Sequence, residues 1–200
     1  MRKLFLSLSL CLAIHCPAQE LAMRDVFKTM PSEMIPYLTE NNRLDFIDFI
    51  DSNMNAEVNN LLGGKSRMTK LSAEYAELKL NEASTVSLRL LPVSEPVDSA
   101  RQIVCMVRTF GTDIQESSIG FYSVNWRPLK TSDYMPDING IMATQTSDNN
   151  SMVVATLHAD VPELTLTTVP KINPPANNEQ KEGEKTSMNL KWNDRFTNER

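Results

Sequence analysis

The chain has 200 residues, 41% of them hydrophobic, so it is long enough to bury a sizeable core. Its 25 acidic residues outnumber its 20 basic ones, and the net charge of −5 argues against nucleic acid and anionic membrane surfaces as ligands. Charges of both signs are spread along the chain, so the acidity is most simply a solubility feature.

The start of the chain has the layout of a secretory leader. Two basic residues precede an apolar run over residues 4–14, and the small residues Cys16 and Ala18 stand at −3 and −1 before Gln19. The apolar run is too short to cross a bilayer, which takes about 20 residues. We therefore expect residues 1–18 to be a signal peptide, with no transmembrane segment in the mature chain and a location in the periplasm or cell envelope.

Cys16 allows a second interpretation, because a bacterial lipoprotein carries its lipid anchor on a cysteine at the end of the leader. That signal requires a small residue before the cysteine, and His15 is bulky, so we favour cleavage before Gln19 over lipidation. Cleavage takes two basic residues away and lowers the net charge from −5 to −7. Cys105 is then the one cysteine left, so no internal disulfide can form, and its apolar neighbours predict a small buried side chain.

Residues 20–62 have the periodicity of helices. Apolar residues recur at spacings of three and four over residues 21–30, and Pro31 is suited to open a short helical turn. A further amphipathic helix is predicted over residues 43–53. Two adjacent glycines at 63 and 64 are expected to end this helical block, because glycine permits a sharp change of direction.

From about residue 67 the period becomes that of strands. Alternating apolar residues predict a hairpin with strands over 78–80 and 85–91 and a turn around Asn81 and Glu82. Residues 103–107 are apolar throughout, which predicts a central strand covered on both faces. Further strands are predicted over residues 119–123, 152–157, 163–169 and 188–192. The gaps between these seven or eight short strands are of hairpin length and favour antiparallel pairing.

Two segments are polar and poorly suited to a core. Residues 128–150 are punctuated by glycine and proline, and residues 171–187 are almost free of apolar side chains, so we expect the second to be a flexible loop. The expected fold class is α+β, with an N-terminal helical block packed on an antiparallel β-sheet of seven to eight short strands. We expect residues 19–200 to form a single domain.

No catalytic or cofactor motif stands out. His158 is the one histidine left after loss of the leader, and no G-x-S-x-G elbow accompanies it, so we interpret it as an ordinary histidine at a strand end. Zinc sites recruit several histidines and cysteines, which the chain lacks. We therefore predict no catalytic residues and no cofactor.

Residues 51–55 have the alternating oxygen donors of a calcium loop. Asp51, Asn53 and Asn55 are the candidate ligands. The pattern then fails, because Ala56 stands where the loop needs glycine and Leu62 where it needs a bidentate glutamate. A solvated helix face that includes Asp51 is the simpler interpretation.

Three aromatic residues lie in or near the polar segment over residues 128–150. They are Tyr122, Trp126 and Tyr134, and aromatic side chains beside a loop can mark a ligand or partner surface. Packing in the core and at its rim is the alternative interpretation of the same residues.

Several stretches of the chain resemble a known protein family. They are MPSEMIPYLTENNRLDFIDFID, LLGGKSRMTKLSAEY, VSLRLLPV, IVCMVRTFGT, ESSIGFYSVNW and LKWNDRF. Together they are similar to domain-of-unknown-function family 3256, uncharacterised exported proteins of Bacteroides-type Gram-negative bacteria. The resemblance implies a leader, an envelope location and a single-domain protein, and it supplies no catalytic residues.

The leading hypothesis for function is a non-enzymatic envelope protein that binds another protein or a glycan. It rests on the leader, the strand-rich build and the missing catalytic residue sets. The alternative is a hydrolase that acts on an envelope or dietary glycan or peptide, because two carboxylates can perform acid–base catalysis without a sequence motif.

Overall fold

The computed structural model describes residues 20–138, 151–170 and 185–198 of the chain. The described part begins with three short helical elements, α1 (Met23–Lys28), the 3₁₀-helix η1 (Ser32–Met34) and α2 (Glu40–Asp51). Strands follow for most of the remaining described residues, interrupted by α3 (Thr131–Tyr134). The described structure is therefore mainly β, with the helices concentrated at its N-terminal end.

The described strands form two antiparallel sheets. The large sheet has seven strands in chain order, β1 (Glu57–Asn59), β2 (Lys65–Leu71), β3 (Tyr75–Asn81), β4 (Ser84–Val97), β5 (Ala100–Phe110), β6 (Glu116–Ser123) and β7 (Pro128–Leu129). The small sheet has four, in the order β11 (Phe196–Thr197), β10 (Ser187–Trp192), β9 (Glu163–Pro170) and β8 (Ser151–Leu157). Within each sheet every strand pairs antiparallel with its neighbour in the chain.

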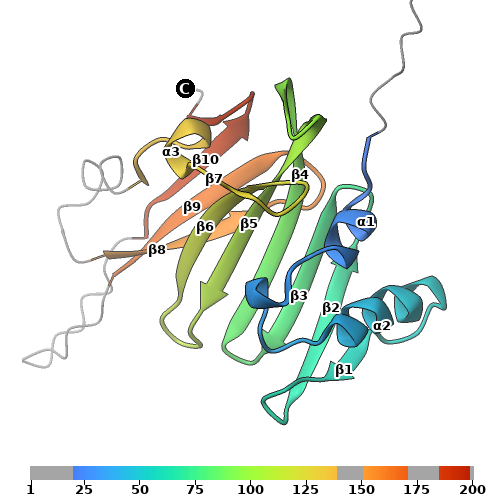
Figure 1. Ribbon diagram of the computed structural model, residues 1–200. Coiled ribbons are helices and arrows are strands. Elements are labelled where there is room, and N and C mark those ends of the chain that lie inside the picture. The colour runs from blue at the N-terminus through green and yellow to red at the C-terminus, as the bar shows by residue number, and fades with distance from the viewer. Residues whose placement is uncertain (1–19, 139–150, 171–184, 199–200) are drawn as a thin grey trace, which may run out of the picture.

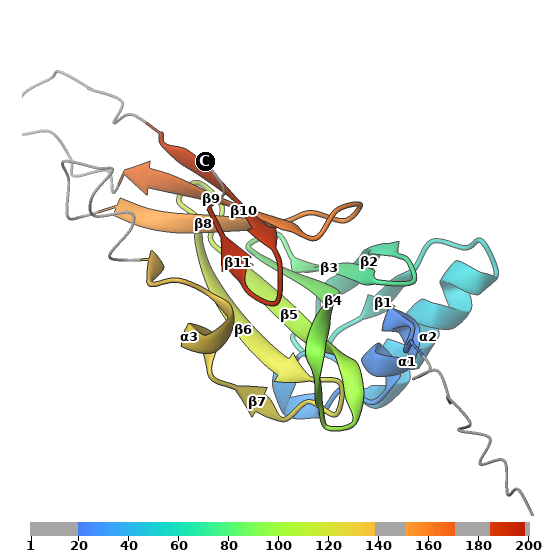
Figure 2. The same ribbon diagram turned by 90° about the horizontal axis from the view of Figure 1, so that it is seen from above.

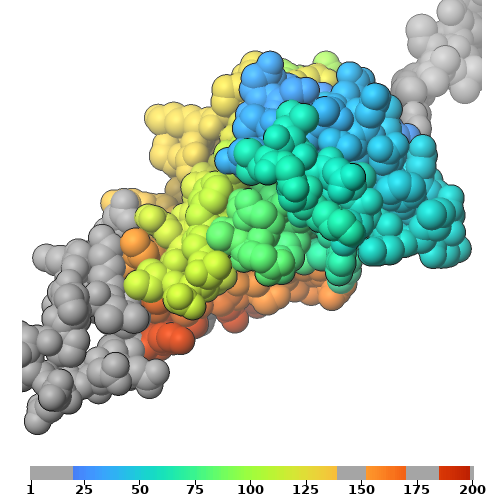
Figure 3. All heavy atoms as spheres, turned by 90° about the horizontal axis from the view of Figure 1, so that it is seen from below, coloured from blue at the N-terminus to red at the C-terminus, as the bar shows by residue number. Residues whose placement is uncertain are grey.

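The two sheets and the helices form three layers (Figures 1 and 2). The helices α1 and α2 cover one face of the large sheet, which we call the helix face. The small sheet covers the other face, which we call the sandwich face. The turns β1–β2, β3–β4 and β5–β6 lie together at one end of the molecule, which Figure 3 views directly.

Strand β5 contributes side chains to the cores on both faces of the large sheet. Val104 and Met106 are buried in the helix-face core, whereas Ile103, Cys105 and Val107 are buried in the sandwich-face core. Successive strand residues point to opposite faces, so a strand buried on both sides must be apolar throughout. The prediction of a central strand over residues 103–107 is thereby confirmed.

Helix α2 begins at a capping box. The Thr39 hydroxyl accepts a hydrogen bond from the Asn42 backbone N–H at 3.1 Å, and the Asn42 side chain accepts one from the Thr39 N–H at 3.1 Å. These two bonds satisfy backbone donors that would otherwise lack partners, so the helix starts earlier than its apolar periodicity suggested. Pro31 directly precedes η1, as predicted.

Three expectations need correction. The strands number eleven in the described residues and form two sheets, where one sheet of seven to eight was expected. Residues 57–59 form strand β1 and not helix, because Asn53 turns the chain into the left-handed region (φ +54°) directly after α2. Residues 128–150, which looked poorly suited to a core, contain β7, α3 and the buried Met135 in their described part.

Other expectations fall wholly or partly outside the described structure. Residues 171–184, most of the expected flexible loop, lie outside it, as do residues 1–19 and 139–150. None of the helices that the structure describes is long and apolar enough to cross a membrane.

Candidate binding groove

A cavity of 500 Å³ opens between the start of β6, the start of β8 and the segment around α3, and we call it the groove. Its apolar lining consists of Ile119, Met135, Pro136, Ile138, Met152 and Val153. Its polar lining, Glu116, Ser117, Thr131, Ser132 and Asp137, supplies hydroxyl and carboxyl groups. Polar and apolar groups thus share the lining of this half-open cavity, and concave sites that combine both kinds of group can hold ligands.

The groove runs beside the edge of the small sheet. Strand β8 pairs with β9 on one side, and no other described strand pairs with it. The Ala155 N–H points away from β9 and donates to the Ser117 hydroxyl at 3.0 Å. In an antiparallel pair the backbone groups of alternate residues point to the same side, so Val153 directs its N–H and C=O toward the groove. The groove thus combines apolar walls with a strand edge.

An aromatic cluster behind the groove holds α3 in place. The Tyr134 ring stacks on Phe121 of β6 and on Trp192 of β10, with ring centroids 5.3 and 6.2 Å apart. The Trp192 indole N–H donates to the Pro92 carbonyl at 2.6 Å, and Phe196 packs edge-on against the same indole. Burial raises the pKa of Tyr134. Because this cluster links both sheets to α3, the wall of the groove that follows Tyr134 is fixed by side-chain packing.

The structure divides the three aromatic residues that the sequence singled out. Tyr122 and Trp126 lie together on the helix face, with ring centroids 6.0 Å apart, and Tyr134 packs on the sandwich face. Trp126 is buried, and its indole N–H donates to the Val26 carbonyl at 2.9 Å. The three residues therefore do not form one continuous surface, and a binding role for any of them stays a prediction.

The calcium candidates lie at the end of α2 and in its connection to β1. The Asp51 carboxylate forms an ion pair with the Arg24 guanidinium of α1, which occupies one of its oxygens. Asn53 and Asn55 follow in the chain, where Asn55 accepts a hydrogen bond from the Glu57 N–H at 2.9 Å through its carbonyl. In the described ranges, no group of three or more His, Cys, Asp or Glu residues is placed to hold a metal ion. Calcium binding by this segment stays a prediction.

Cys105 and His158 both lie in surroundings that favour a structural role. Cys105 is fully buried in β5, and this burial raises the pKa of its thiol, which keeps the sulfur protonated and unreactive. The His158 Nε2 lies 2.7 Å from the Thr165 hydroxyl, which itself donates to the Asn189 side-chain oxygen at 2.7 Å. Since the Thr165 proton goes to Asn189, His158 donates here and does not act as a base toward the hydroxyl.

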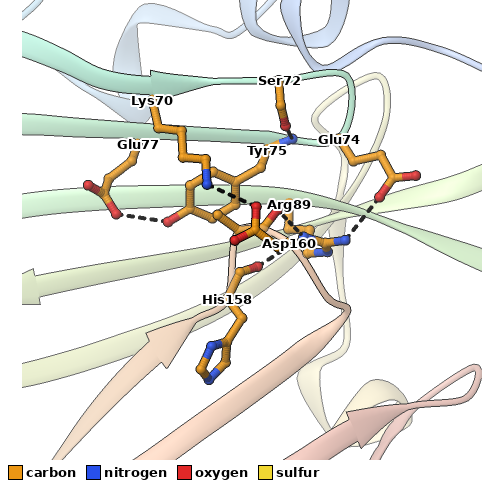
Figure 4. Close-up of polar contacts among 9 residues, drawn as sticks. Lys70, Ser72, Glu74, Tyr75, Glu77, Arg89, His158 and Asp160 are labelled. Atoms are coloured by element: carbon orange, nitrogen blue, oxygen red, sulfur yellow. Dashed lines mark hydrogen bonds and ion pairs between the residues drawn. The ribbon is translucent and has the colours of Figure 1, made fainter.

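Figure 4 shows a polar cluster at the turn between β8 and β9, centred on Arg89 of β4. Arg89 is only 3% exposed, and its Nη1 donates to the carbonyls of His158 and Ala159 at 2.9 and 2.8 Å. Its Nη2 donates to the Glu74 carboxylate at 2.9 Å. The guanidinium therefore ties the turn of the small sheet to the large sheet.

Two more polar contacts surround Arg89 (Figure 4). The Tyr75 hydroxyl donates to the Glu77 carboxylate at 2.8 Å, and burial raises the pKa of Tyr75 to about 12. Lys70 and Asp160 form an exposed ion pair at 3.0 Å. This cluster was not predicted, because Arg89 alternates with apolar residues in a strand whose pattern is that of a half-buried hairpin. A charged residue within such an alternation gives no sign that a second sheet covers it.

The comparisons with known proteins agree with this fold. A family model described as "Protein of unknown function (DUF3256)" matches residues 13–173. Among solved structures, a domain of an uncharacterized protein from Porphyromonas gingivalis W83 is similar, with a TM-score of 0.67 and 20% sequence identity. The similarity covers 88% of this chain and 96% of that one, and at this identity it supports the fold alone. No curated protein matches the chain.

Proposed function

Because the chain belongs to the family described as "Protein of unknown function (DUF3256)", we propose its function from the groove: the chain is an exported envelope protein that binds an extended peptide. One observation carries this proposal, namely that apolar walls and the β8 edge meet at the same cavity. An extended peptide can use both features, since its backbone bonds to a strand edge while alternate side chains enter apolar pockets.

A glycan fits the groove less well than a peptide. Sugar rings pack on aromatic platforms, and none of the described residues that line the groove is aromatic, its apolar walls including Ile119, Met152 and Val153. On this side of β8 the Ala155 N–H is bonded to Ser117, and the backbone groups of Val153 are the ones that can pair with another strand. A peptide with small or medium apolar side chains at alternate positions is therefore the ligand that we propose.

A peptide-display experiment tests this proposal. A random peptide library is selected against residues 19–200, and the enriched peptides are measured by fluorescence anisotropy. We expect Val153→Pro to weaken binding, because proline removes the N–H on the groove side and leaves the β9 pairing intact. Met152→Glu should also weaken binding, because it places a charge on the apolar wall of the groove. Met54→Glu, at an exposed methionine outside the groove, is the matched control. Binding that neither groove variant changes would refute the proposal.

The leader supports the envelope location that we propose, and its processing can be tested directly. Mass spectrometry of the protein purified from its host should find an N-terminus at Gln19. A mature N-terminus at a lipid-modified Cys16 would instead identify the protein as a lipoprotein and would place it on a membrane surface. Retention of residues 1–18 in the cytoplasmic fraction would contradict export.

A hydrolase is the second candidate, because Glu116 and Asp137 line the same groove. Two carboxylates in one cavity can supply a general acid and a base or nucleophile. The test is turnover of a panel of glycans and peptides by the wild type, followed by Glu116→Gln and Asp137→Asn. Loss of turnover in either folded variant would support the hydrolase, whereas a wild type without turnover would remove it.

A further inference from the structure

The turn between β1 and β2 presents two leucines to solvent. Leu61 is 65% exposed and Leu62 is 62% exposed, and we call residues 60–64 the leucine turn. Single exposed apolar residues are ordinary, but two adjacent leucines at a tip form a patch whose exposure costs hydrophobic free energy. Nothing in the packing of the described core requires leucine at either position. A contact with another molecule would account for both.

The leucine turn is held rigidly by one buried side chain. The Asn60 side-chain oxygen accepts hydrogen bonds from the N–H groups of Leu62 and Gly64 at 3.0 and 3.1 Å. The Asn60 amide donates to the Ser66 hydroxyl at 3.1 Å and to the Leu80 carbonyl at 3.2 Å. With its backbone fixed in this way, the turn loses little conformational entropy when a partner binds its leucines.

A shallow cavity that is widely open to solvent lies beside the leucine turn. The Leu61 N–H donates to the Tyr37 carbonyl at 2.9 Å, which joins the turn to the segment between η1 and α2. Leu61, Pro36 and Leu38 give the cavity apolar walls, and Figure 3 shows the turn and this segment side by side on one end of the molecule. The cavity therefore continues the apolar surface of the two leucines.

The charged groups on this cavity are acidic. Glu33 and Glu40 line it, and none of the ion pairs in the described residues involves either of them. The Arg43 guanidinium is buried below them, where it donates to the Leu38 carbonyl and interacts electrostatically with both Glu33 and Glu40, and the half-buried Arg108 donates to the Met34 carbonyl. A partner approaching from solvent thus meets an apolar surface on which the charged lining residues are Glu33 and Glu40, with Arg43 buried behind them.

We propose that the leucine turn and this cavity bind a second protein through an amphipathic segment that carries basic residues. An apolar side chain of that segment fills the cavity, and a neighbouring lysine or arginine pairs with Glu33 and Glu40. A second copy of the chain is the poorer occupant, because a symmetric contact would place Glu33 and Glu40 of both copies together on a chain of net charge −5.

This surface is separate from the groove. The leucine turn belongs to the β1–β2 edge of the large sheet, whereas the groove adjoins β6 near its other edge. One molecule could therefore hold a peptide in the groove and contact the basic segment at the leucine turn. The proposal does not depend on the groove being occupied.

Peptide selection with a matched pair of variants tests the proposal. A random peptide library is selected against residues 19–200 and depleted against the double variant Leu61→Ser, Leu62→Ser. The enriched peptides should carry Lys or Arg close to a large apolar residue, and the double variant should weaken their binding about tenfold or more. Glu33→Gln with Glu40→Gln should weaken it severalfold and reduce its salt dependence. Val161→Ser, at another exposed apolar turn residue, should leave affinity unchanged.

Each of the other outcomes overturns the proposal. Enriched peptides without basic residues, or binding that the serine variants do not change, would show that this surface does not recognise such a segment. Self-association of the wild type that the serine variants abolish would identify a second copy as the occupant. Retention on vesicles of phosphatidylethanolamine and phosphatidylglycerol, lost in the same variants, would identify a membrane. Both leucines are exposed, so unchanged thermal melting should verify that the variants fold.

Discussion

The two faces of the large sheet are covered in different ways. On the helix face the covering elements precede the sheet in the chain, and Val26, Phe46 and Ile47 share one core with buried side chains of β1 to β5. On the sandwich face the covering strands follow the sheet, and Leu164, Leu166 and Leu190 share one core with buried side chains of β5 and β6. The comparison shows that a single sheet can be buried on both faces by different kinds of element. Helices that precede it in the chain cover one face, and strands that follow it cover the other.

Each face also buries one arginine, and the two differ in their partners. Arg43 on the helix face makes one hydrogen bond, at 3.3 Å, to the Leu38 carbonyl. Arg89 on the sandwich face makes three, to His158, Ala159 and Glu74. Burial lowers the pKa of both guanidinium groups, and each Nε lacks a partner in the described structure. Because the two side chains are equally buried but make different numbers of hydrogen bonds, we expect their replacement to change the free energy of unfolding by different amounts.

The largest expected effect comes from cavities in the two cores. Leu88→Ala on the helix face and Leu164→Ala on the sandwich face each remove a fully buried side chain, and each should cost about 2–5 kcal/mol. The two tryptophans report the faces separately, because Trp126 lies on the helix face and Trp192 beside the sandwich-face core. With the other tryptophan replaced by phenylalanine, both probes should follow one urea transition. A Leu164→Ala variant that shifts only the Trp192 transition would show that the faces unfold independently.

The buried arginines sharpen the comparison. Arg89→Met leaves the His158 and Ala159 carbonyls without their donor and should destabilise the protein by about 3 kcal/mol. Arg43→Met removes a buried charge with one long hydrogen bond, and an apolar replacement of similar volume should be within about 1 kcal/mol of the wild type. Urea denaturation of both variants measures the difference. Equal losses would mean that burial, and not hydrogen bonding, sets the contribution of each arginine.

Tyr75 gives the sandwich face a dependence on high pH. Its folded pKa of about 12 lies above the ordinary value of 10, so the folded state favours the neutral phenol. The stability from this difference is fully present below pH 10 and is lost as the pH rises from 10 through about 12. Urea midpoints measured across this range should fall for the wild type and fall less for Tyr75→Phe. Parallel slopes for the two proteins would assign the dependence to other groups.

The smallest expected effect is at the helix ends that hold the calcium candidates. Asp51→Asn breaks the ion pair with Arg24, and since both side chains are substantially exposed the cost should be below about 1 kcal/mol. Because the pair already engages Asp51, we expect thermal melting to be the same with calcium and with a chelator. A calcium-dependent rise that Asp51→Asn abolishes would establish the site at Asp51, Asn53 and Asn55.

Local patterns explain which parts of the fold were predictable. The hairpin of β3 and β4 and the pair of β8 and β9 were found because alternation and turn residues act over a few neighbouring positions. The start of α2 was placed too late, because the capping box at Thr39 carries no apolar signal. Strand β1 was missed because three residues are too few to display a period.

The candidate groove could not be found from the sequence, because its walls are not neighbours in the chain. Its walls come from β6, the segment around α3, and β8, and only the packing of the small sheet on the large one brings them together. Tyr122, Trp126 and Tyr134 are close in the chain, yet the alternation of β6 and the turn after it send them to opposite faces.

By itself the sequence determined the strands of the two main hairpins, the doubly buried β5 and the buried, unpaired Cys105, because these depend on side-chain polarity at neighbouring positions. Tertiary structure decided that the strands divide into two sheets, that Arg89 is buried, and that the groove and the leucine turn lie at separate edges. The apolar pattern of a strand shows that one of its faces is buried, but not which element covers that face. The covering element is decided by contacts between residues far apart in the chain, which a local pattern does not encode.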